Sequence, residues 1–156
     1  MNPKMANYVA TFFGLGLARK FEGSIASLVT ALMWYTLFLF FDFSIIVILF
    51  TNLFIFFIAY KSIVEYQKTS NKSDPQEIVI DEVSGMSISL IGGSLYFTSI
   101  HFLLAFLIFR VLDFFKPSII YRFEVDKKDS SILMDDVVSG LFTLIIMLSL
   151  SSSGIV

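Results

Sequence analysis

Cysteine is absent from the sequence, and histidine occurs only once, at position 101. The lack of cysteine excludes a disulfide framework and a Cys-ligated zinc site. A single histidine disfavours zinc and other metals that prefer soft ligands. Charged residues are also few, at 15%, and the net charge of −2 points to no particular partner. The N-terminus shows no charged segment followed by an apolar run and a small-residue cleavage site, so we expect no cleavable signal peptide.

The chain is instead rich in apolar and aromatic residues. Hydrophobic residues fill 56% of its 156 positions, 19 positions are phenylalanine, and the mean hydropathy is +0.83. These values lie outside the usual composition of soluble globular proteins. Since no internal repeat or low-complexity linker divides the chain, we expect one domain over residues 1–156. The composition predicts an integral membrane protein.

The longest apolar region, residues 24–60, contains one charged residue, Asp42. This region is too long for one membrane-spanning helix and about right for two of roughly 18 residues each. Aspartate and serine favour turns and helix N-caps, so we place the break at residues 41–44. The sequence therefore predicts helices over residues 24–41 and 44–65. Residues 7–17, which precede this hairpin, are typical of an amphipathic stretch lying along the membrane surface.

Two further apolar segments follow in the second half of the chain. Residues 83–91 would form a helix of about 14 Å, which is half a bilayer. Gly92-Gly93-Ser94 then supplies a turn, and residues 95–112 are again long enough to span, with His101 expected to be a packed residue. Together with a last apolar run over residues 137–150, the pattern predicts an all-α, polytopic membrane bundle. It would have about four spans and a short half-span helix.

The charged residues separate by membrane side if each segment returns to the opposite face. All eleven lysines and arginines and twelve of the thirteen acids then fall on one face, which leaves Asp42 alone on the other. Because lysine and arginine bias sets the orientation of membrane proteins, we expect the charged face to be cytoplasmic. The N-terminus would lie on this face and Val156 on the opposite one.

Two acidic pairs border apolar segments on the charged face. Asp81-Glu82 ends a polar loop just before the short helix, and Asp135-Asp136 would lie in the first turn of the last helix if residues 132–134 extend it. Carboxylates at a membrane boundary are energetically unfavourable unless they have a functional role, so they are candidate site residues. We expect the two pairs to face each other across a hard cation such as Mg²⁺, which prefers oxygen ligands.

A basic group accompanies these acids at the end of the segment 95–112. Arg110 and Asp113 are three residues apart and share one face of a helix end. Arg110 offers a planar fork for a phosphate, and Lys116 offers a point charge. The residues alone leave open a second interpretation, in which these charges form a salt-bridge network that ties the helix ends together.

Four blocks of the sequence resemble the phosphatidylglycerophosphatase A family, bacterial enzymes that remove the phosphate from phosphatidylglycerophosphate. The second and third blocks carry most of the resemblance, and the four occur in the family's order over nearly the whole chain. This sequence departs from the family pattern at Glu22 and Ile119, where the family has prolines, and at Ala26, where it has a glycine. The four blocks are Gly14-Leu15-Gly16 with Glu22-Gly23-Ser24-Ile25-Ala26-Ser27; Ile78-Val79-Ile80-Asp81-Glu82-Val83 with Gly85; Phe109-Arg110-Val111-Leu112-Asp113 with Lys116-Pro117; and Ile132-Leu133-Met134-Asp135-Asp136 with Ser139-Gly140.

The resemblance implies a Mg²⁺-dependent phosphomonoesterase in the bacterial inner membrane, with its active face cytoplasmic. Its substrate would be the phospholipid phosphatidylglycerophosphate and its products phosphatidylglycerol and phosphate. No nucleic-acid partner is expected, and no pattern indicates an oligomeric state. The implied residues are Asp81, Glu82, Arg110, Asp113 and Lys116 for catalysis; Gly23, Ser24, Ser27, Arg110 and Lys116 for substrate binding; and Asp81, Glu82, Asp135 and Asp136 for the metal.

Two other classes of protein are less consistent with the residues. An alcohol phosphatidyltransferase needs a constellation of aspartates before an Ala-Arg pair, and none precedes Ala18-Arg19. A non-catalytic scaffold or transporter subunit is the other alternative. A transporter places ionisable groups near the middle of the membrane, whereas only Asp42 and His101 lie away from the charged face.

Overall fold

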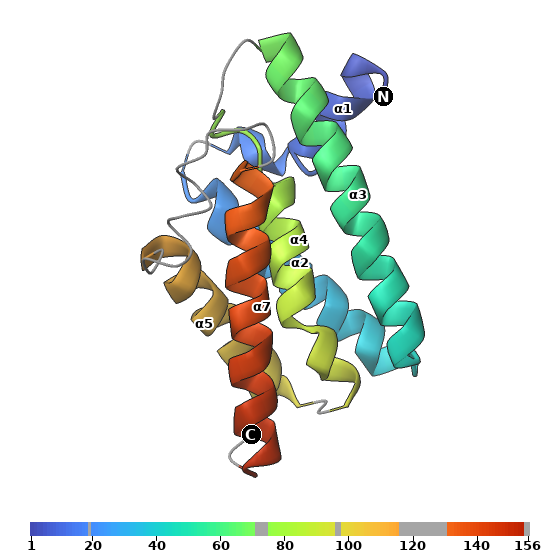
Figure 1. The fold of residues 1–156 in the computed structure, drawn as a ribbon, viewed down its shortest axis with the longest axis vertical. Helices are drawn as coiled ribbons and strands as arrows, with labels where there is room; N and C mark the ends of the chain where they lie inside the picture. Colours follow the sequence, from blue (N-terminus) through green and yellow to red (C-terminus); the bar gives the residue numbers. More distant parts are fainter. Residues whose placement is uncertain (19, 71–74, 96–97, 116–130, 155–156) are drawn as a thin grey trace.

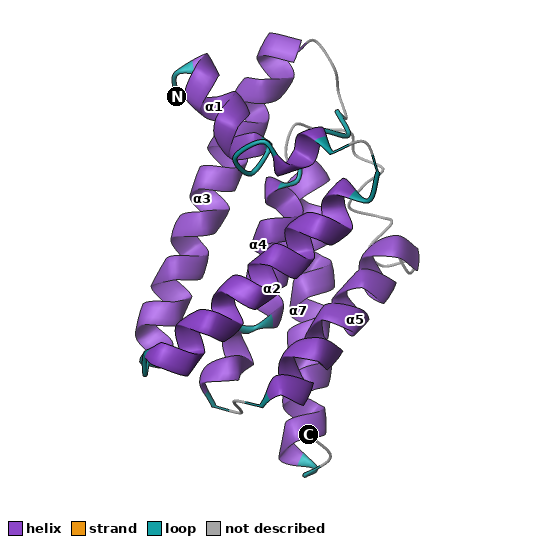
Figure 2. Cartoon of the chain, turned by 180° about the vertical axis from the view of Figure 1, so that it is seen from behind, coloured by secondary structure: helices purple, strands orange, loops and turns teal. Residues whose placement is uncertain are grey.

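The computed structural model describes residues 1–18, 20–70, 75–95, 98–115 and 131–154, and over these ranges every regular element is a helix (Figures 1 and 2). The predicted all-α class is therefore confirmed. In chain order the elements are α1 (Pro3–Ala10), the 3₁₀ turn η1 (Leu15–Leu17), α2 (Glu22–Phe40), α3 (Ile45–Ser70), α4 (Ile80–Ser89), the 3₁₀ turn η2 (Ile91–Ser94), α5 (Ser99–Phe115) and α7 (Ser131–Ser152).

Three of these helices, α2, α3 and α7, are long and apolar enough to cross a membrane. Helix α5 has 17 residues and so extends for about 25 Å, slightly less than the hydrocarbon core of a bilayer. The prediction of about four spans agrees with these three helices plus α5. Helix α4, with 10 residues, is the predicted half-span element.

The predicted break between the first two long helices is confirmed. Helix α2 ends at Phe40 and α3 begins at Ile45, with the Ser44 side chain accepting a hydrogen bond from the backbone nitrogen of Val47 at 3.4 Å. Helix α3 continues to Ser70, five residues beyond the prediction. Its polar last part includes lysine, glutamate and glutamine, which are good helix formers.

The amphipathic surface stretch predicted over residues 7–17 is only partly helical. Helix α1 ends at Ala10, and the chain then reverses through Phe12, Phe13 and Gly14, whose φ angles are 44°, 59° and 93°. The helix packs on α3, with Ala6 and Ala10 buried. A turn at Gly14 therefore interrupts the predicted stretch.

Both acidic pairs occupy different helix positions from those predicted. Helix α4 begins at Ile80, so Asp81 and Glu82 lie in its first turn and not at the end of a loop. The positive end of the helix dipole favours carboxylates there. Helix α7 begins at Ser131, so Asp135 and Asp136 lie beyond its first turn. The prediction placed this helix start too late because it followed the apolar run alone.

Helix α4 is the centre of the bundle, and nine of its ten residues are buried. It packs against α2, α3 and α5, and most extensively against α7, which runs beside it in the same direction (Figure 1). A Cβ atom added to Gly140 of α7 would overlap the Gly85 carbonyl of α4, and one added to Gly85 would lie 2.5 Å from the Asp136 carbonyl oxygen. The absence of side chains at both glycines therefore lets the two backbones touch, as small residues do between membrane helices.

The two termini of the chain mark opposite ends of the bundle. The N-terminus lies at the same end as the start of α7, and the C-terminal end of α7 lies at the opposite end (Figure 1). His101 is fully buried near that opposite end, where its Nδ1 lies 3.5 Å from the Ser151 hydroxyl oxygen. It is a packed histidine, as predicted, and lies far along the bundle from the acidic pairs.

Candidate functional site

The two acidic pairs meet where α4 and α7 touch. One carboxylate oxygen from each of Asp81, Glu82 and Asp136 lies within 4.8 Å of the other two. Asp81 and Asp136 are buried, and Glu82 is partly buried. The glycine contact between the helices lies about one turn further along from each pair, so it holds the two helix starts together. The prediction that the pairs face each other is therefore consistent with the geometry.

Asp135, the fourth predicted metal ligand, is not part of this group of three. It is buried, and its Oδ1 accepts a hydrogen bond from the backbone nitrogen of Asp136 at 3.1 Å. Of this pair, Asp136 contributes an oxygen to the group, and Asp135 lies near enough for its charge to act on Asp81. In α4 both members of the pair belong to the group: Asp81 contributes one oxygen, and the longer side chain of its neighbour Glu82 also reaches it.

The carboxylates of α4 carry a strong electrostatic penalty when ionised. Burial, and next the neighbouring Glu82 charge, raise the pKa of Asp81 well above its ordinary value. Burial also raises the pKa of Glu82, against the opposing effects of a hydrogen bond to Asp81 and of the Arg110 charge. Several carboxylates this close favour protons or a cation between them.

Nothing in the described part of the chain neutralises this group of three directly. Over those residues, no lysine or arginine forms an ion pair with Asp81, Glu82 or Asp136, and Glu82 Oε2 is buried without a hydrogen-bond partner. All the potential ligands are oxygens, which suits a hard divalent cation. The group could hold a metal ion, and a cation there would satisfy both the charge and the unpaired oxygen.

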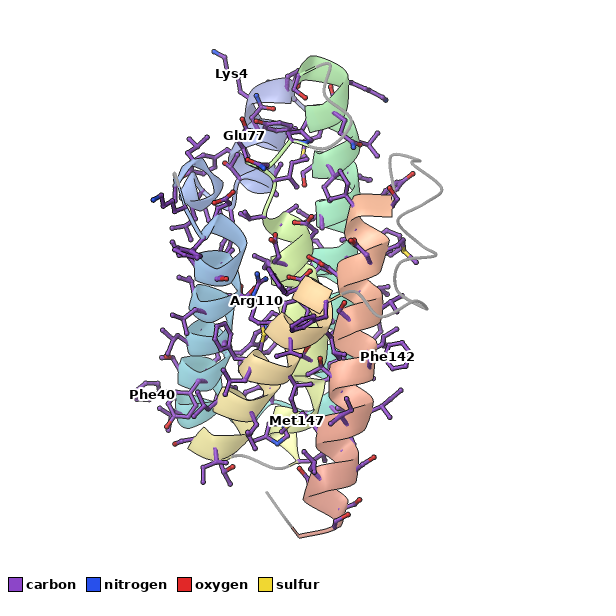
Figure 3. The ribbon with its side chains drawn as sticks, turned by 90° about the vertical axis from the view of Figure 1, so that its left-hand side faces the viewer. Lys4, Phe40, Glu77, Arg110, Phe142 and Met147 are labelled. Carbon is purple, nitrogen blue, oxygen red and sulfur yellow. The ribbon has the colours of Figure 1, made fainter. Side chains whose placement is uncertain are left out.

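Arg110 lies beside the acidic group near the end of α5, on the side that faces α2 (Figure 3). Its Nη1 is 2.6 Å from Asp113 Oδ2 and donates a hydrogen bond to the Ser27 hydroxyl at 3.4 Å. The Ser27 hydroxyl in turn donates to the Gly23 carbonyl at 2.8 Å. The guanidinium is therefore held from both sides, and 22% of the side chain remains exposed, so a ligand can reach it.

The predicted substrate-binding residues have different positions in the structure. Gly23 and Ser24 line the pocket next to Arg110, but Ser27 is fully buried and touches Arg110 instead. Gly23 also packs against the acidic group, because a Cβ atom there would overlap Glu82 Oε1. Lys116 lies outside the described residues.

A pocket of about 470 Å³ opens between the start of α2, the loop before α4, the end of α5 and the start of α7. It brings Asp81, Glu82 and Arg110 to one surface, and we call it the site pocket. The sequence pattern missed Glu22, which was noted only where the family has a proline, and Phe114, although both neighbour motif residues. The polar lining residues are Glu22, Ser24, Gln76, Asp81, Glu82 and Arg110, and the apolar ones include Phe21, Ile78, Phe114 and Ile132.

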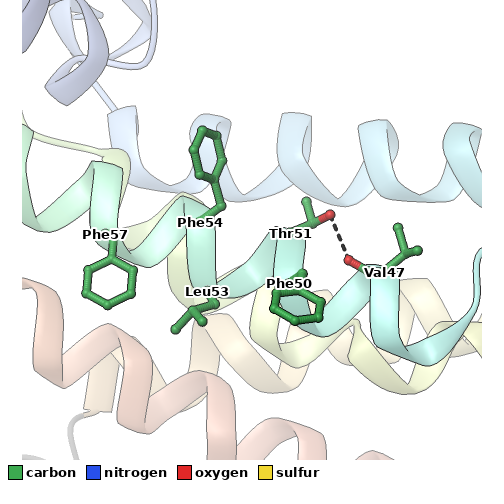
Figure 4. Close-up of a pocket in the computed structure, with 6 residues that line it drawn as sticks. All are labelled: Val47, Phe50, Thr51, Leu53, Phe54 and Phe57. Atoms are coloured by element: carbon green, nitrogen blue, oxygen red, sulfur yellow. Dashed lines mark hydrogen bonds between the residues drawn. The ribbon is translucent and has the colours of Figure 1, made fainter.

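A second hollow, of about 560 Å³, lies on the outward face of α3 and lacks any charged group (Figure 4). Its one hydroxyl, on Thr51, donates to the Val47 carbonyl of the same helix at 2.9 Å. Phe50, Leu53 and Phe54 provide most of its apolar lining. This hollow offers no chemistry and is typical of a lipid-facing helix surface.

The fold and the site together define a polytopic helical membrane protein with a pocket lined by charged residues at one end. The family model for phosphatidylglycerophosphatase A matches residues 8–151, and the chain belongs to this family. It is therefore an enzyme, a phosphatase of lipid phosphate monoesters. The resemblance that the sequence motifs indicated is confirmed.

A curated relative from Bacteroides thetaiotaomicron gives an independent comparison. It is 26% identical over 144 residues, which cover 88% of each chain, and its name is "Putative phosphatidylinositol-3-phosphatase". No solved structure matches the chain significantly. The family match and the curated relative both favour a lipid phosphatase over the scaffold and the phosphatidyltransferase alternatives.

Because Gly23 packs against Glu82, we expect a substitution at Gly23 to affect cation binding without lowering stability. In Gly23→Ala the new methyl group should displace the flexible Glu82 carboxylate; if the group of three holds a divalent cation, binding of Mg²⁺ as the probe ion should weaken about tenfold, as loss of support around a metal ligand commonly does. The unfolding temperature without Mg²⁺ should not fall, because alanine favours a helix over glycine. The measurement is thermal unfolding in detergent across a Mg²⁺ titration.

Gly92→Ala is the matched control for this variant. Its added Cβ atom would lie 3.3 Å from Leu148 Cδ2 near the opposite end of the bundle, where the leucine side chain can adjust. The control should keep the wild-type response to Mg²⁺. A wild-type response in Gly23→Ala as well would contradict the placement of Glu82 as a ligand.

Proposed function

We propose that the protein is a Mg²⁺-dependent phosphatidylglycerophosphatase, which hydrolyses phosphatidylglycerophosphate to phosphatidylglycerol and phosphate. The observation that carries this proposal is the convergence of Asp81, Glu82 and Asp136 within 4.8 Å beside Arg110, in a chain of this family. The relative's name favours a second candidate substrate, phosphatidylinositol 3-phosphate. Phosphate release from micelles of each lipid, with and without Mg²⁺, tests the proposal and discriminates between the substrates.

The residues around the pocket suit a reaction that depends on positioning and charge neutralisation more than on covalent chemistry. We assign Arg110 to bind the phosphoryl oxygens, while Asp113 and Ser27 hold its guanidinium in place. Asp81, Glu82 and Asp136 would hold Mg²⁺, which supplies Lewis-acid polarisation of the phosphoryl group when bound. Gly23 and Ser24 would contribute the wall against which the headgroup lies.

We assign roles to two further predicted residues, Lys116 and Asp135. Lys116 would add a second positive charge for the phosphate, six residues after Arg110 in the chain. Asp135 would contribute its negative charge next to the group of three, since its charge acts on that of Asp81.

The proposed active face is the cytoplasmic face of a bacterial inner membrane. The support is the segregation of all eleven lysines and arginines to one side in the topology inferred from the sequence. In the bundle, the described N-terminal residues and the end of α7 lie at opposite ends, as this topology requires (Figure 1).

Impermeant thiol labelling tests this orientation, and the cysteine-free chain makes the background clean. In intact cells Ser152→Cys should be labelled, because the end of α7 would face outward, and Ser70→Cys at the end of α3 should not. Permeabilised cells should label both variants, which controls for accessibility. The reverse pattern in intact cells would place the site pocket on the outer face.

Removal of a single carboxylate should abolish turnover without unfolding the protein. In Asp81→Asn and Asp136→Asn we expect kcat to fall by at least about two orders of magnitude at saturating Mg²⁺, because each change removes both a charge and a ligand. The asparagine side chains fit the same space, and relief of carboxylate repulsion should keep or raise the unfolding temperature. Asp42→Asn, at the opposite end of the bundle, is the control and should remain active. Full activity in either site variant would leave the acids as a structural network only.

The arginine gives a second test, which separates phosphate binding from helix tethering. Arg110→Lys keeps the positive charge but loses the planar fork, so kcat should fall about a hundredfold while the unfolding temperature stays near wild type. If Arg110 only tied α5 to α2, Arg110→Lys and Asp113→Asn would both lower stability and leave kcat nearly unchanged. Steady-state kinetics and thermal unfolding of both variants distinguish the two cases.

A further inference from the structure

An apolar groove of about 250 Å³ runs between α2 and α5, the two helices that also form one side of the site pocket. We call it the α2–α5 groove. Its floor includes Ala31 and Phe102, which are only 6% and 5% exposed. Its rim is formed by Leu28, Leu32 and Leu103, which are 45%, 55% and 57% exposed. A buried floor between exposed leucines makes this a channel open to the side of the bundle.

The α2–α5 groove continues the site pocket along the same helix faces. On α5, Arg110 lines the pocket, and Phe106 and Leu103, four and seven residues earlier, line the groove. On α2, Ser24 lines the pocket, and Leu28 lines the groove four residues later. These spacings place the residues of each helix on one stripe.

The site pocket and the α2–α5 groove are separated by a short distance along both helices. Four residues of helix correspond to about 6 Å, so the groove begins roughly one turn from the polar pocket on both helices. Helices α2 and α5 lie next to each other along this length (Figure 2). The lining therefore changes from charged to apolar within one turn, as a ligand with a phosphate head and an apolar tail would require.

A polar contact between its two helices lies at the end of the groove away from Arg110. The Tyr35 hydroxyl and the Ser99 hydroxyl lie 2.9 Å apart, and the Tyr35 ring packs edge-on against Phe102 with the ring centres 5.2 Å apart. A ligand in the groove would thus have a defined inner end.

The hollow on α3 shows that the α2–α5 groove is more than an ordinary gap between lipid-facing side chains. All the residues that line the α3 hollow come from one helix, and none of them lines the site pocket (Figure 4). The α2–α5 groove lies between two helices, has a buried floor and leads to Arg110. Only the α2–α5 groove connects membrane lipid to the charged residues.

We propose that the α2–α5 groove binds an acyl chain of the lipid substrate while its phosphate lies in the site pocket. The proposal rests on the assignment of a lipid phosphate monoester as substrate, and it adds where the lipid is held and by which helices. Substrate then enters sideways from the bilayer between α2 and α5, with its chain remaining in an apolar environment throughout. Because the bilayer and the groove are both apolar, the groove gains little hydrophobic free energy from the chain; packing against Ala31 and Phe102 instead fixes the direction of the chain relative to Arg110.

The test compares two variants with the same substitution at similar exposure. Leu103→Trp fills the rim of the groove, and Leu53→Trp, at a leucine that is 50% exposed, fills the α3 hollow. The readout is kcat/KM for long-chain phosphatidylglycerophosphate divided by kcat/KM for its short-chain analogue, both in detergent. We expect Leu103→Trp to lower this ratio at least about tenfold and Leu53→Trp to leave it at the wild-type value. Equal ratios in the two variants would overturn the proposal.

A binding measurement on the unmodified protein separates this proposal from the proposed function. The probe is phosphatidylglycerophosphate with a photoreactive group in one acyl chain, and the labelled peptides are mapped by mass spectrometry. Label should appear on α2 and α5, and unlabelled phosphatidylglycerophosphate should compete with it, whereas diacylglycerol should not. Label on α3 to the same extent, or label insensitive to this competition, would show ordinary membrane lipid around the bundle and refute the groove. Competed labelling without phosphate release would support the groove and refute the phosphatase assignment.

Discussion

The contact between the backbones of α4 and α7 is the constraint on which the rest of the structure depends. Gly85 and Gly140 let the helices approach until their backbones touch, and any side chain at either position would push them apart. Because both helices run in the same direction, their N-terminal parts also meet. Each of these parts carries an acidic pair, so a packing feature of two glycines creates a site of converging carboxylates.

The close approach also brings several carboxylates together in a buried place. Like charges within a few ångströms in a buried setting repel each other strongly, and burial raises the pKa of Asp81 and Glu82. Among the described residues, Arg110 lies beside the group, is held by Asp113 and Ser27, and does not form an ion pair with the three carboxylates. A divalent cation between the carboxylates would relieve their repulsion and leave Arg110 to meet an anionic ligand.

The position of the site follows from the unequal lengths of the helices. Helix α4 is too short to cross a membrane and is buried by α2, α3, α5 and α7 on all sides. Its first turn, with Asp81 and Glu82, therefore lies within the bundle but near the end at which the site pocket opens. The pocket there opens toward the start of α2 and the end of α5, so that charged and lipid-facing surfaces lie within a helical turn of each other.

The sequence by itself determined the class of the protein and the types of residue at the site. Long apolar runs require a membrane, the polar break at Asp42 divides two helices, and paired carboxylates beside an arginine predict cation and phosphate chemistry. These features are local, since hydropathy and residue chemistry do not depend on distant contacts. The motif order also indicated the family, which the comparison confirmed.

Only the tertiary structure decided which of these residues meet. Asp136 joins Asp81 and Glu82 in the group of three and Asp135 does not, because the glycine contact with α4 sets the rotation of α7 about its axis. Ser27, which the motif indicated as a substrate residue, is buried one turn along α2 from Gly23 and accepts a hydrogen bond from Arg110. The Gly23–Glu82 contact joins residues far apart in the chain, and no local pattern encodes such a distance. Helix rotation and crossing arise from packing over the whole bundle, so they become visible only in three dimensions.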